Sequence, residues 1–138
     1  MNSSPENRIK VGSDICSVRR IMRVYEKYGA RFLNKILTET EKIYVLSKLS
    51  KGAPDKTHRL TEVLAGRFAA KEAVAKALGT GWRGIHWHDV EIINAESGAP
   101  YAVLHGRAQE LLARLGCQCI EISLSHEREY ALAVALLY

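Results

Sequence analysis

One segment in the middle of the chain decides the fold: 66-GRFAAKEAVAKALGTG-81. Alanine is the best helix former, and glycines after the last apolar residue end a helix. The pattern predicts a helix from about Thr61 to Leu78. At about 100° per residue, six side chains fall on one arc, which we predict to be the core face. They are Val63, Gly66, Ala70, Val74, Ala77 and Leu78.

The charged residues of this helix are typical of a phosphate-binding segment. Arg67 and Lys71 flank the apolar arc and must either reach water or find an anion, because burying an unpaired charge is very costly. Glu72 points away from the core, among small side chains that let a ligand come close. The bland alternative is an ordinary amphipathic helix, in which Glu72 and Lys76 form an i,i+4 pair worth about 0.3 kcal/mol.

Composition bounds the class of protein. The 138 residues, 47% hydrophobic and 25% charged, fit one globular domain with a real core. No apolar run approaches the ~20 residues of a membrane span, and the first seven residues lack a signal-peptide core. We therefore expect a soluble, intracellular protein. Three cysteines without a zinc spacing, Cys16, Cys117 and Cys119, predict reduced core thiols.

A net charge of +5 and a pI near 9.2 favour an acidic partner. Nucleic acid, a phosphorylated small molecule and an acidic protein all fit that charge. From Ser17 to Tyr28 an apolar helical stripe faces a basic one, formed by Arg19, Arg20, Arg23 and Lys27. A solvated helix face is usually mixed in sign, so this basic stripe indicates binding. The preceding alternation, from Ile9 to Ile15, predicts a half-buried strand that ends near Asp14.

The remaining elements predict an α+β domain, mainly antiparallel sheet with helices packed on it. A capping box at Thr38 and Glu41 begins a helix that runs to about Leu49. Two hairpins follow on either side of a helix, with the first strand slipping at Asp89 as if at a bulge. They are expected at residues 85–92 with 101–104, and at 120–126 with 130–136, the helix lying at 107–115. Alternating alanines at 131, 133 and 135 leave one face of the last strand smooth, as though something large packs there.

Two carboxylates are placed among cations: Asp14 at a strand end and Glu72 on the helix. Magnesium is typically held by one or two carboxylates, with waters and substrate phosphate oxygens completing its shell. Nearby Lys and Arg would neutralise the remaining phosphate charge. The loop after the helix is not a Walker site, because it follows a helix and lacks the terminal Lys-Ser/Thr.

Several segments, in order along the chain, together resemble a known family. They read VGSDI at 11–15, GRFAAKEA at 66–73, KALGTG at 76–81, WHDVEI at 87–92, GAP at 98–100 and SLSHE at 123–127. The chain is similar to the holo-acyl-carrier-protein synthases, the short, trimeric type within the 4′-phosphopantetheinyl transferase superfamily. The resemblance implies that family's fold over residues 9–138, after a tail at 1–8.

The resemblance implies transfer of 4′-phosphopantetheine from coenzyme A to a serine of apo acyl carrier protein, in fatty acid biosynthesis. It implies Mg²⁺ ligands at Asp14 and Glu72, and a catalytic set of Glu72, Asp14 and Lys76. Coenzyme A contacts fall on Arg67, Lys71, Lys76, Gly79, Thr80, Gly81, Ser125 and His126. The carrier-protein surface falls on Arg19, Arg20, Arg23, Lys27 and Arg31. The base for the serine proton stays open between Glu72 and a metal-bound water.

The resemblance also implies a homotrimer with active sites between subunits, which offers a reason for the smooth alanine face. The expected location is the cytoplasm, or the mitochondrial matrix if the chain is processed. Neither nucleic acid nor a membrane is then an expected partner. The alternative from charge and size is a non-enzymatic nucleic-acid-binding module. Asp14 and Glu72 separate the two, because a binder of phosphate backbones gains nothing from carboxylates beside its cations.

Overall fold

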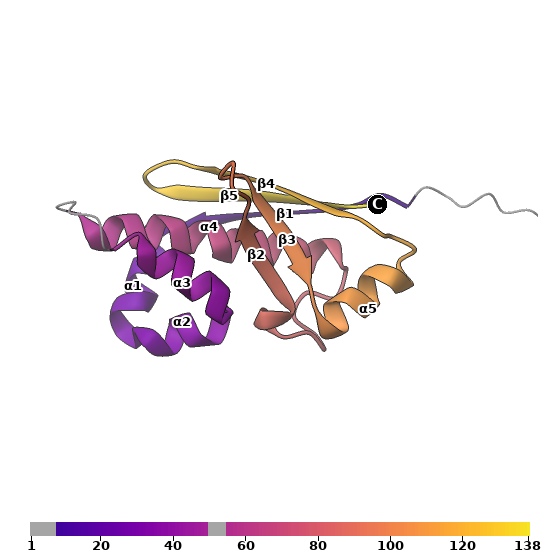
Figure 1. The fold of residues 1–138 in the computed structure, drawn as a ribbon, viewed down its shortest axis with the longest axis horizontal. Coiled ribbons are helices and arrows are strands. Elements are labelled where there is room, and N and C mark those ends of the chain that lie inside the picture. The colour runs from indigo at the N-terminus through magenta and orange to yellow at the C-terminus, as the bar shows by residue number, and fades with distance from the viewer. Residues whose placement is uncertain (1–7, 50–54) are drawn as a thin grey trace, which may run out of the picture.

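The computed structural model describes residues 8–49 and 55–138 (Figure 1). The predicted tail, residues 1–8, therefore lies outside the described residues except for Arg8. The elements, in chain order, are β1 Lys10–Ser17, α1 Val18–Tyr28, α2 Ala30–Ile36, α3 Glu39–Ser47, α4 Lys56–Ala77, the 3-10 turn η1 Trp87–Asp89, β2 Val90–Asn94, β3 Pro100–Leu104, α5 Gly106–Arg114, β4 Ile120–His126 and β5 Tyr130–Leu137. This mixture of helices and antiparallel strands confirms the α+β prediction.

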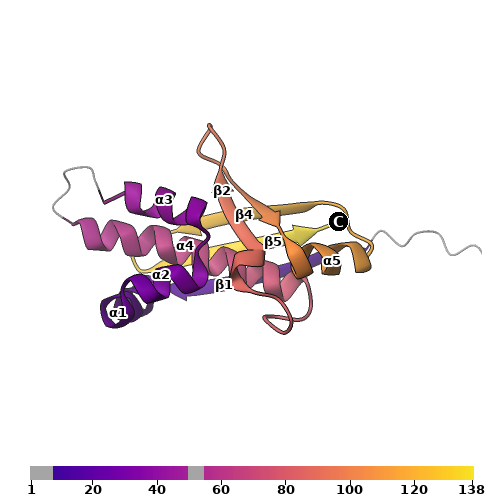
Figure 2. The same ribbon diagram turned by 60° about the horizontal axis from the view of Figure 1, so that its bottom comes forward.

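The long helix α4 forms the centre of the fold. A three-stranded antiparallel sheet, in the order β1-β5-β4, packs on one side of it. The helices α1 and α3 and the strand β2 pack elsewhere around it, as Figures 1 and 2 show. The expectation of a single apolar arc is therefore wrong: Ala65, which lies outside the predicted arc, has no exposed surface.

The strand β1 crosses α4 in direct backbone contact at Gly12. A Cβ atom placed on Gly12 would lie 2.0 Å from the Ala73 carbonyl oxygen and 2.6 Å from the Ala77 nitrogen. Only glycine allows this approach. Two residues further along the strand, on the same face, comes Asp14. The close crossing therefore sets how near Asp14 lies to α4.

The sheet turns its small residues inward. Ala131, Ala133 and Ala135 are fully buried, and α4 of the same chain packs against β5. The idea that a second subunit covers the alanine face is therefore wrong. The larger apolar residues lie on the opposite face, and all helices labelled in Figure 1 lie on the α4 side of the sheet. The large apolar residues exposed on that outer face are Val11, Ile15, Tyr130, Leu132 and Val134, with exposed polar residues such as Ser13 and Ser125 among them.

Local chemistry explains where elements begin. The Ser17 hydroxyl accepts from the Arg20 N–H at the start of α1, and Thr38 and Glu41 form the predicted capping box of α3. The helix α4 begins at Lys56, earlier than predicted, because Asp55 caps it by accepting from the His58 N–H. Two details differ from expectation: α2 has no counterpart in the sequence prediction, and the slip at Asp89 is the 3-10 turn η1 instead of a bulge.

Candidate functional site

The described residues bring Asp14 and Lys76 together. Lys76 Nζ lies 3.1 Å from Asp14 Oδ1 and donates to the Ser13 carbonyl oxygen at 2.9 Å. The lysine side chain is 52% exposed and the aspartate side chain 17%. The bland alternative placed Lys76 against Glu72, but its ion pair joins two elements, β1 and α4. This favours a site over a solvated helix face.

Glu72 has a different partner. The indole Nε1 of Trp82 donates to Glu72 Oε1 at 3.1 Å. Trp82 stacks on Trp87, with ring centroids 3.8 Å apart. Phe68 also stacks on Trp87, with ring centroids 5.2 Å apart. Sequence reasoning missed Trp82, although an indole donor shortly after a helix that carries an outward carboxylate is a usable signal.

Cys16 lies two residues after Asp14 on the same face of β1. Burial, followed by the negative charge of Asp14, raises the pKa of its thiol to about 11; Arg20 opposes this shift, and Glu72 adds a smaller increase. The prediction of a buried, reduced thiol is confirmed for Cys16 and Cys117, while Cys119 is exposed.

The two carboxylates suit a hard cation. Both are partly accessible, and both come from the crossing of β1 and α4. In residues 8–49 and 55–138, no three His, Cys, Asp or Glu side chains gather as a closed metal site would require. One or two carboxylates without further protein ligands suit Mg²⁺, which keeps waters and phosphate oxygens in its shell.

Lys71 lies elsewhere and is fully buried. Its Nζ donates to Glu41 Oε1 at 2.7 Å and to the Trp87 carbonyl oxygen at 3.0 Å. Desolvation lowers the pKa of this ammonium group, and Glu41 opposes that effect. The cation has thus found an anion instead of water. The resemblance implies a coenzyme A contact at Lys71, whereas the structure places its ammonium group inside the fold, paired with Glu41.

Arg67 is also buried and engaged within the fold. Its guanidinium hydrogen-bonds the Asn94 side chain and lies 4.7 Å from the centroid of the Tyr44 ring. Burial lowers the pKa of Arg67. The structure thus separates the motif's cations: Arg67 and Lys71 pack toward α3 and β2, and Lys76 lies by Asp14.

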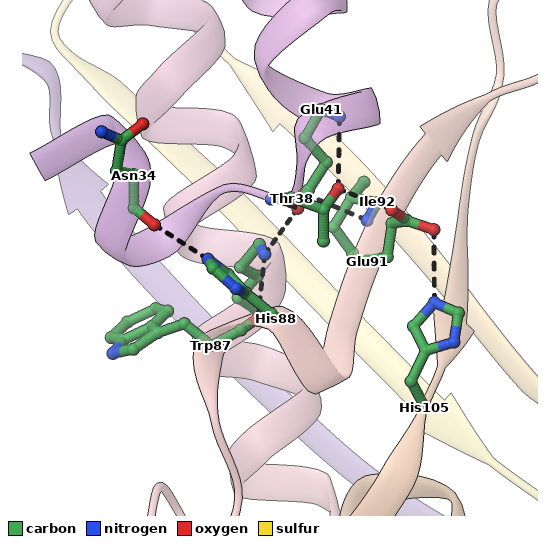
Figure 3. Close-up of polar contacts among 9 residues, drawn as sticks. Asn34, Thr38, Glu41, Trp87, His88, Glu91, Ile92 and His105 are labelled. Carbon is green, nitrogen blue, oxygen red and sulfur yellow. Dashed lines mark hydrogen bonds and ion pairs between the residues drawn. The ribbon is translucent and has the colours of Figure 1, made fainter. Parts of the chain in front are cut away.

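Glu41 pairs with the buried Lys71 and also contacts Thr38 and Ile92, which Figure 3 shows. Its Oε1 accepts from the Thr38 N–H at 2.9 Å, and its Oε2 accepts from the Ile92 N–H at 3.2 Å. One carboxylate therefore caps α3, holds β2 and pairs with Lys71. Sequence reasoning found the cap but missed the ion pair, because nothing local links Glu41 to a residue thirty positions away.

Ser125 and His126 lie at the exposed end of β4. His126 pairs with Ala131, which pairs in turn with Cys16, so His126 and Cys16 share one row and one face of the sheet. Ser125 faces the other way, toward the outer apolar face. Of these two residues, His126 is the one on the same sheet face as Asp14.

The loop after α4 is built around glycines. Gly79 and Gly81 have φ values of 84° and 56°, which other residues rarely adopt. The Gly79 N–H bonds to the Lys76 carbonyl and the Gly81 N–H to the Ala75 carbonyl. The predicted loop is confirmed in place, immediately beside Lys76.

The basic stripe is exposed as predicted. Arg19, Arg20, Arg23 and Lys27 lie on the surface of α1, and Arg31 on that of α2. Beside them is a cavity of about 480 Å³ with an aromatic and aliphatic lining and two cations. Its lining residues are Val24, Tyr28, Arg31, Phe32, Lys35, Ile36, Phe68 and Trp87. An acidic protein that inserts an apolar side chain would suit this combination.

None of the helices in the described part of the chain is both long and apolar enough to cross a bilayer.

Comparison with known proteins identifies the family. Residues 10–135 match the family model described as the 4′-phosphopantetheinyl transferase superfamily. A holo-[acyl-carrier-protein] synthase of Gloeobacter violaceus is 46% identical over 124 residues, which are 90% of this chain and 88% of that protein.

Solved structures agree. The Bacillus anthracis holo-(acyl-carrier-protein) synthase, in complex with CoA (3′,5′-ADP), has a TM-score of 0.72 and 34% identity and matches 93% of this chain and 94% of its own. The Helicobacter pylori enzyme in complex with coenzyme A has a TM-score of 0.76 and 27% identity, over 93% and 99%. Nothing in these comparisons supports the nucleic-acid-binding alternative. The chain belongs to the 4′-phosphopantetheinyl transferase superfamily, as a relative of the holo-[acyl-carrier-protein] synthases.

Proposed function

We propose that this protein is a holo-[acyl-carrier-protein] synthase that moves the 4′-phosphopantetheine group of coenzyme A onto a serine of apo acyl carrier protein. The products are holo carrier protein and adenosine 3′,5′-bisphosphate. The observation that carries the proposal is the pairing of Asp14, from β1, with Lys76 of α4, the helix that also bears Glu72. The names of the relatives, and the coenzyme A in two of their structures, support the substrate pair.

Asp14 and Glu72 would hold magnesium. When bound, the ion would supply charge stabilisation to the pyrophosphate as the bond to the leaving phosphate breaks. Lys76, now on Asp14, has a flexible and half-exposed side chain. It can turn to the phosphates once the aspartate charge is taken up by the ion. Glu72 is this chain's own candidate for the group that accepts the serine proton.

The proposed coenzyme A contacts are Lys76, the 79–81 loop, Ser125 and His126. Their support is position: the loop adjoins Lys76, and His126 shares the sheet face of Asp14. We do not include Arg67 and Lys71 among the proposed coenzyme A contacts, because their charged groups are buried and bonded within the fold. We assign them to holding α3 and β2 against α4.

The basic stripe and the adjacent cavity are the proposed docking surface for the acidic carrier protein. Reversing the charge of Arg20 and Arg23, which are exposed, should raise the KM for carrier protein well above its original value and leave the KM for coenzyme A almost unchanged. Equal increases in both constants would contradict docking at this stripe.

The outer face of the sheet is the proposed contact between copies of this chain, in a homotrimer. Val11 and Ile15 are 66% and 65% exposed there, and such apolar patches mark interaction surfaces. The outer face therefore takes the place of the alanine face of β5 as the proposed subunit contact, because α4 of the same chain covers the alanines. Sedimentation of an active monomer at micromolar concentration would contradict the assembly. The proposal also places the protein in the cytoplasm, where both substrates are available.

A mass measurement tests the reaction itself. The protein is incubated with apo acyl carrier protein, coenzyme A and magnesium, and the carrier's mass is followed. The phosphopantetheine increment should appear, and it should vanish with a chelator and in Asp14→Ala or Glu72→Ala. Absence of the increment with every carrier protein offered would overturn the proposed function.

A further inference from the structure

Trp82 makes a contact that the proposed reaction does not yet use. Its indole Nε1 donates to Glu72 Oε1 at 3.1 Å, although the two residues lie on different segments, the loop and α4. The donor can only donate, so this bond requires the carboxylate oxygen to face the indole. The contact therefore restricts how the Glu72 carboxylate can rotate.

The loop is folded so as to bring Trp82 back over the helix. Gly79, Gly81 and Gly84 have φ values of 84°, 56° and 75°. The Gly81 N–H reaches back to the Ala75 carbonyl oxygen at 3.2 Å, so the chain reverses next to the last turn of α4. The glycine-rich loop thus has a second consequence besides adjoining Lys76: it delivers an indole to Glu72.

The position of the Trp82 ring is fixed by aromatic stacking. Its ring stacks on Trp87 with centroids 3.8 Å apart, and Trp87 stacks on Phe68. The main chain of Trp87 is fixed by Lys71 Nζ, which donates to its carbonyl oxygen at 3.0 Å. The buried Lys71–Glu41 pair therefore anchors the aromatic stack that supports the Trp82 donor.

We propose that Trp82 is a positioning residue for Glu72: its indole N–H holds the carboxylate in the orientation that binds magnesium. This inference rests on the proposed function, which assigns Glu72 to the metal. Hydrogen bonds to ligating carboxylates orient them, and losing such a bond commonly weakens metal binding by about tenfold or more. Trp82 never touches substrate or metal in this proposal.

The test compares Trp82→Phe with Trp87→Phe. The first keeps an aromatic ring in the stack but removes the N–H donor, and the second keeps the donor. Binding of Mn²⁺, as a spectroscopic probe of the magnesium site, is measured by electron paramagnetic resonance with saturating coenzyme A. We expect about tenfold weaker binding in Trp82→Phe and binding within about twofold of the original in Trp87→Phe. The KM for carrier protein should stay unchanged in Trp82→Phe, because Trp82 does not line the proposed docking cavity.

The outcomes separate this inference from the function on which it rests. Unchanged Mn²⁺ binding in Trp82→Phe, with binding lost in Asp14→Ala, would overturn the role of Trp82 and leave the metal site standing. Unchanged binding in Asp14→Ala as well would overturn both. Equal weakening in Trp82→Phe and Trp87→Phe would assign the effect to the ring stack and overturn the role of the donor.

A fluorescence measurement makes the inference testable even if Trp82→Phe does not fold. The chain has two tryptophans, so Trp82 is the single one in Trp87→Phe. Adding magnesium to this variant, with coenzyme A present, should change the Trp82 emission, because the indole N–H is bonded to the ligating carboxylate. Emission that stays constant while the metal binds would overturn the proposal.

Discussion

Lys71 and Lys76 lie five residues apart on α4, yet their ammonium groups have opposite surroundings. The Lys71–Glu41 pair has no exposed side-chain surface, and each partner makes further hydrogen bonds to backbone groups. The Lys76–Asp14 pair is 52% and 17% exposed. Buried charges need complete pairing, whereas exposed ones can change partners. The same kind of residue therefore stabilises the fold at one position and is available to a ligand at the other.

Removing the buried lysine should have the largest effect. Lys71→Ala leaves the Glu41 carboxylate buried without its cation, and breaking such a pair typically costs about 3–5 kcal/mol of unfolding free energy. Chemical denaturation measures it. The matched control is Lys76→Ala, which breaks an exposed pair worth at most about 1 kcal/mol. A loss in Lys71→Ala no larger than in the control would remove the distinction between the two pairs.

Gly12 tests the geometry of the exposed side. Its α-hydrogen faces the α4 backbone, so Gly12→Ala must push β1 away from the helix, at a cost of about 3 kcal/mol, and should carry Asp14 away from Lys76 with loss of activity. The control is Gly66→Ala: nothing lies within 4 Å of the added Cβ atom, and alanine favours the helix. If the two variants were equally stable, β1 could not be in contact with α4 at this point.

The Cys16 thiol reports on the negative charge near the exposed pair. Its pKa is raised from 9.0 to about 11, so the folded state holds this proton longer than the unfolded state does. The contribution of this thiol to the free energy of unfolding is complete below pH 9. About 2 kcal/mol of it is lost as the pH rises to 11. The measurement is the pH dependence of unfolding in the original protein minus that in Cys16→Ala. Identical curves above pH 9 would be inconsistent with a buried thiol next to Asp14.

Lys76→Gln should have the smallest effect, and on substrate binding instead of stability. Loss of a charge-assisted bond to phosphate should raise the KM for coenzyme A by about tenfold. The same variant should unfold within about 1 kcal/mol of the original protein. Steady-state kinetics with varied coenzyme A measures this KM. An unchanged KM would mean that Lys76 serves only to pair with Asp14.

Much of this fold could be predicted from local patterns, and the rest depends on contacts between distant residues. Alternation predicted the first strand, three residues too short at its end, and the final hairpin, but a period of two does not say which face is buried. The alanines of β5 face inward because α4 packs close to them, so the larger residues lie outside. Only tertiary structure reveals that preference.

The site shows the same division. Periodicity predicted the outward position of Glu72. It also predicted that the first strand ends near Asp14, which is wrong, because β1 continues to Ser17 and Asp14 lies within it. Periodicity could not predict which cations are buried, because the burial of Lys71 depends on its pairing with Glu41, a residue of α3. Trp82 was missed because the loop geometry that returns it to α4 comes from three positive φ angles.

A crystal structure of the protein with coenzyme A and magnesium measures both lysines and both carboxylates at once. We expect the ion between Asp14 and Glu72, Lys76 Nζ on a phosphate oxygen, and Lys71 Nζ still bonded to Glu41. A metal bound away from the two carboxylates, or Lys71 on a phosphate with Glu41 released, would contradict the division of roles between the two lysines.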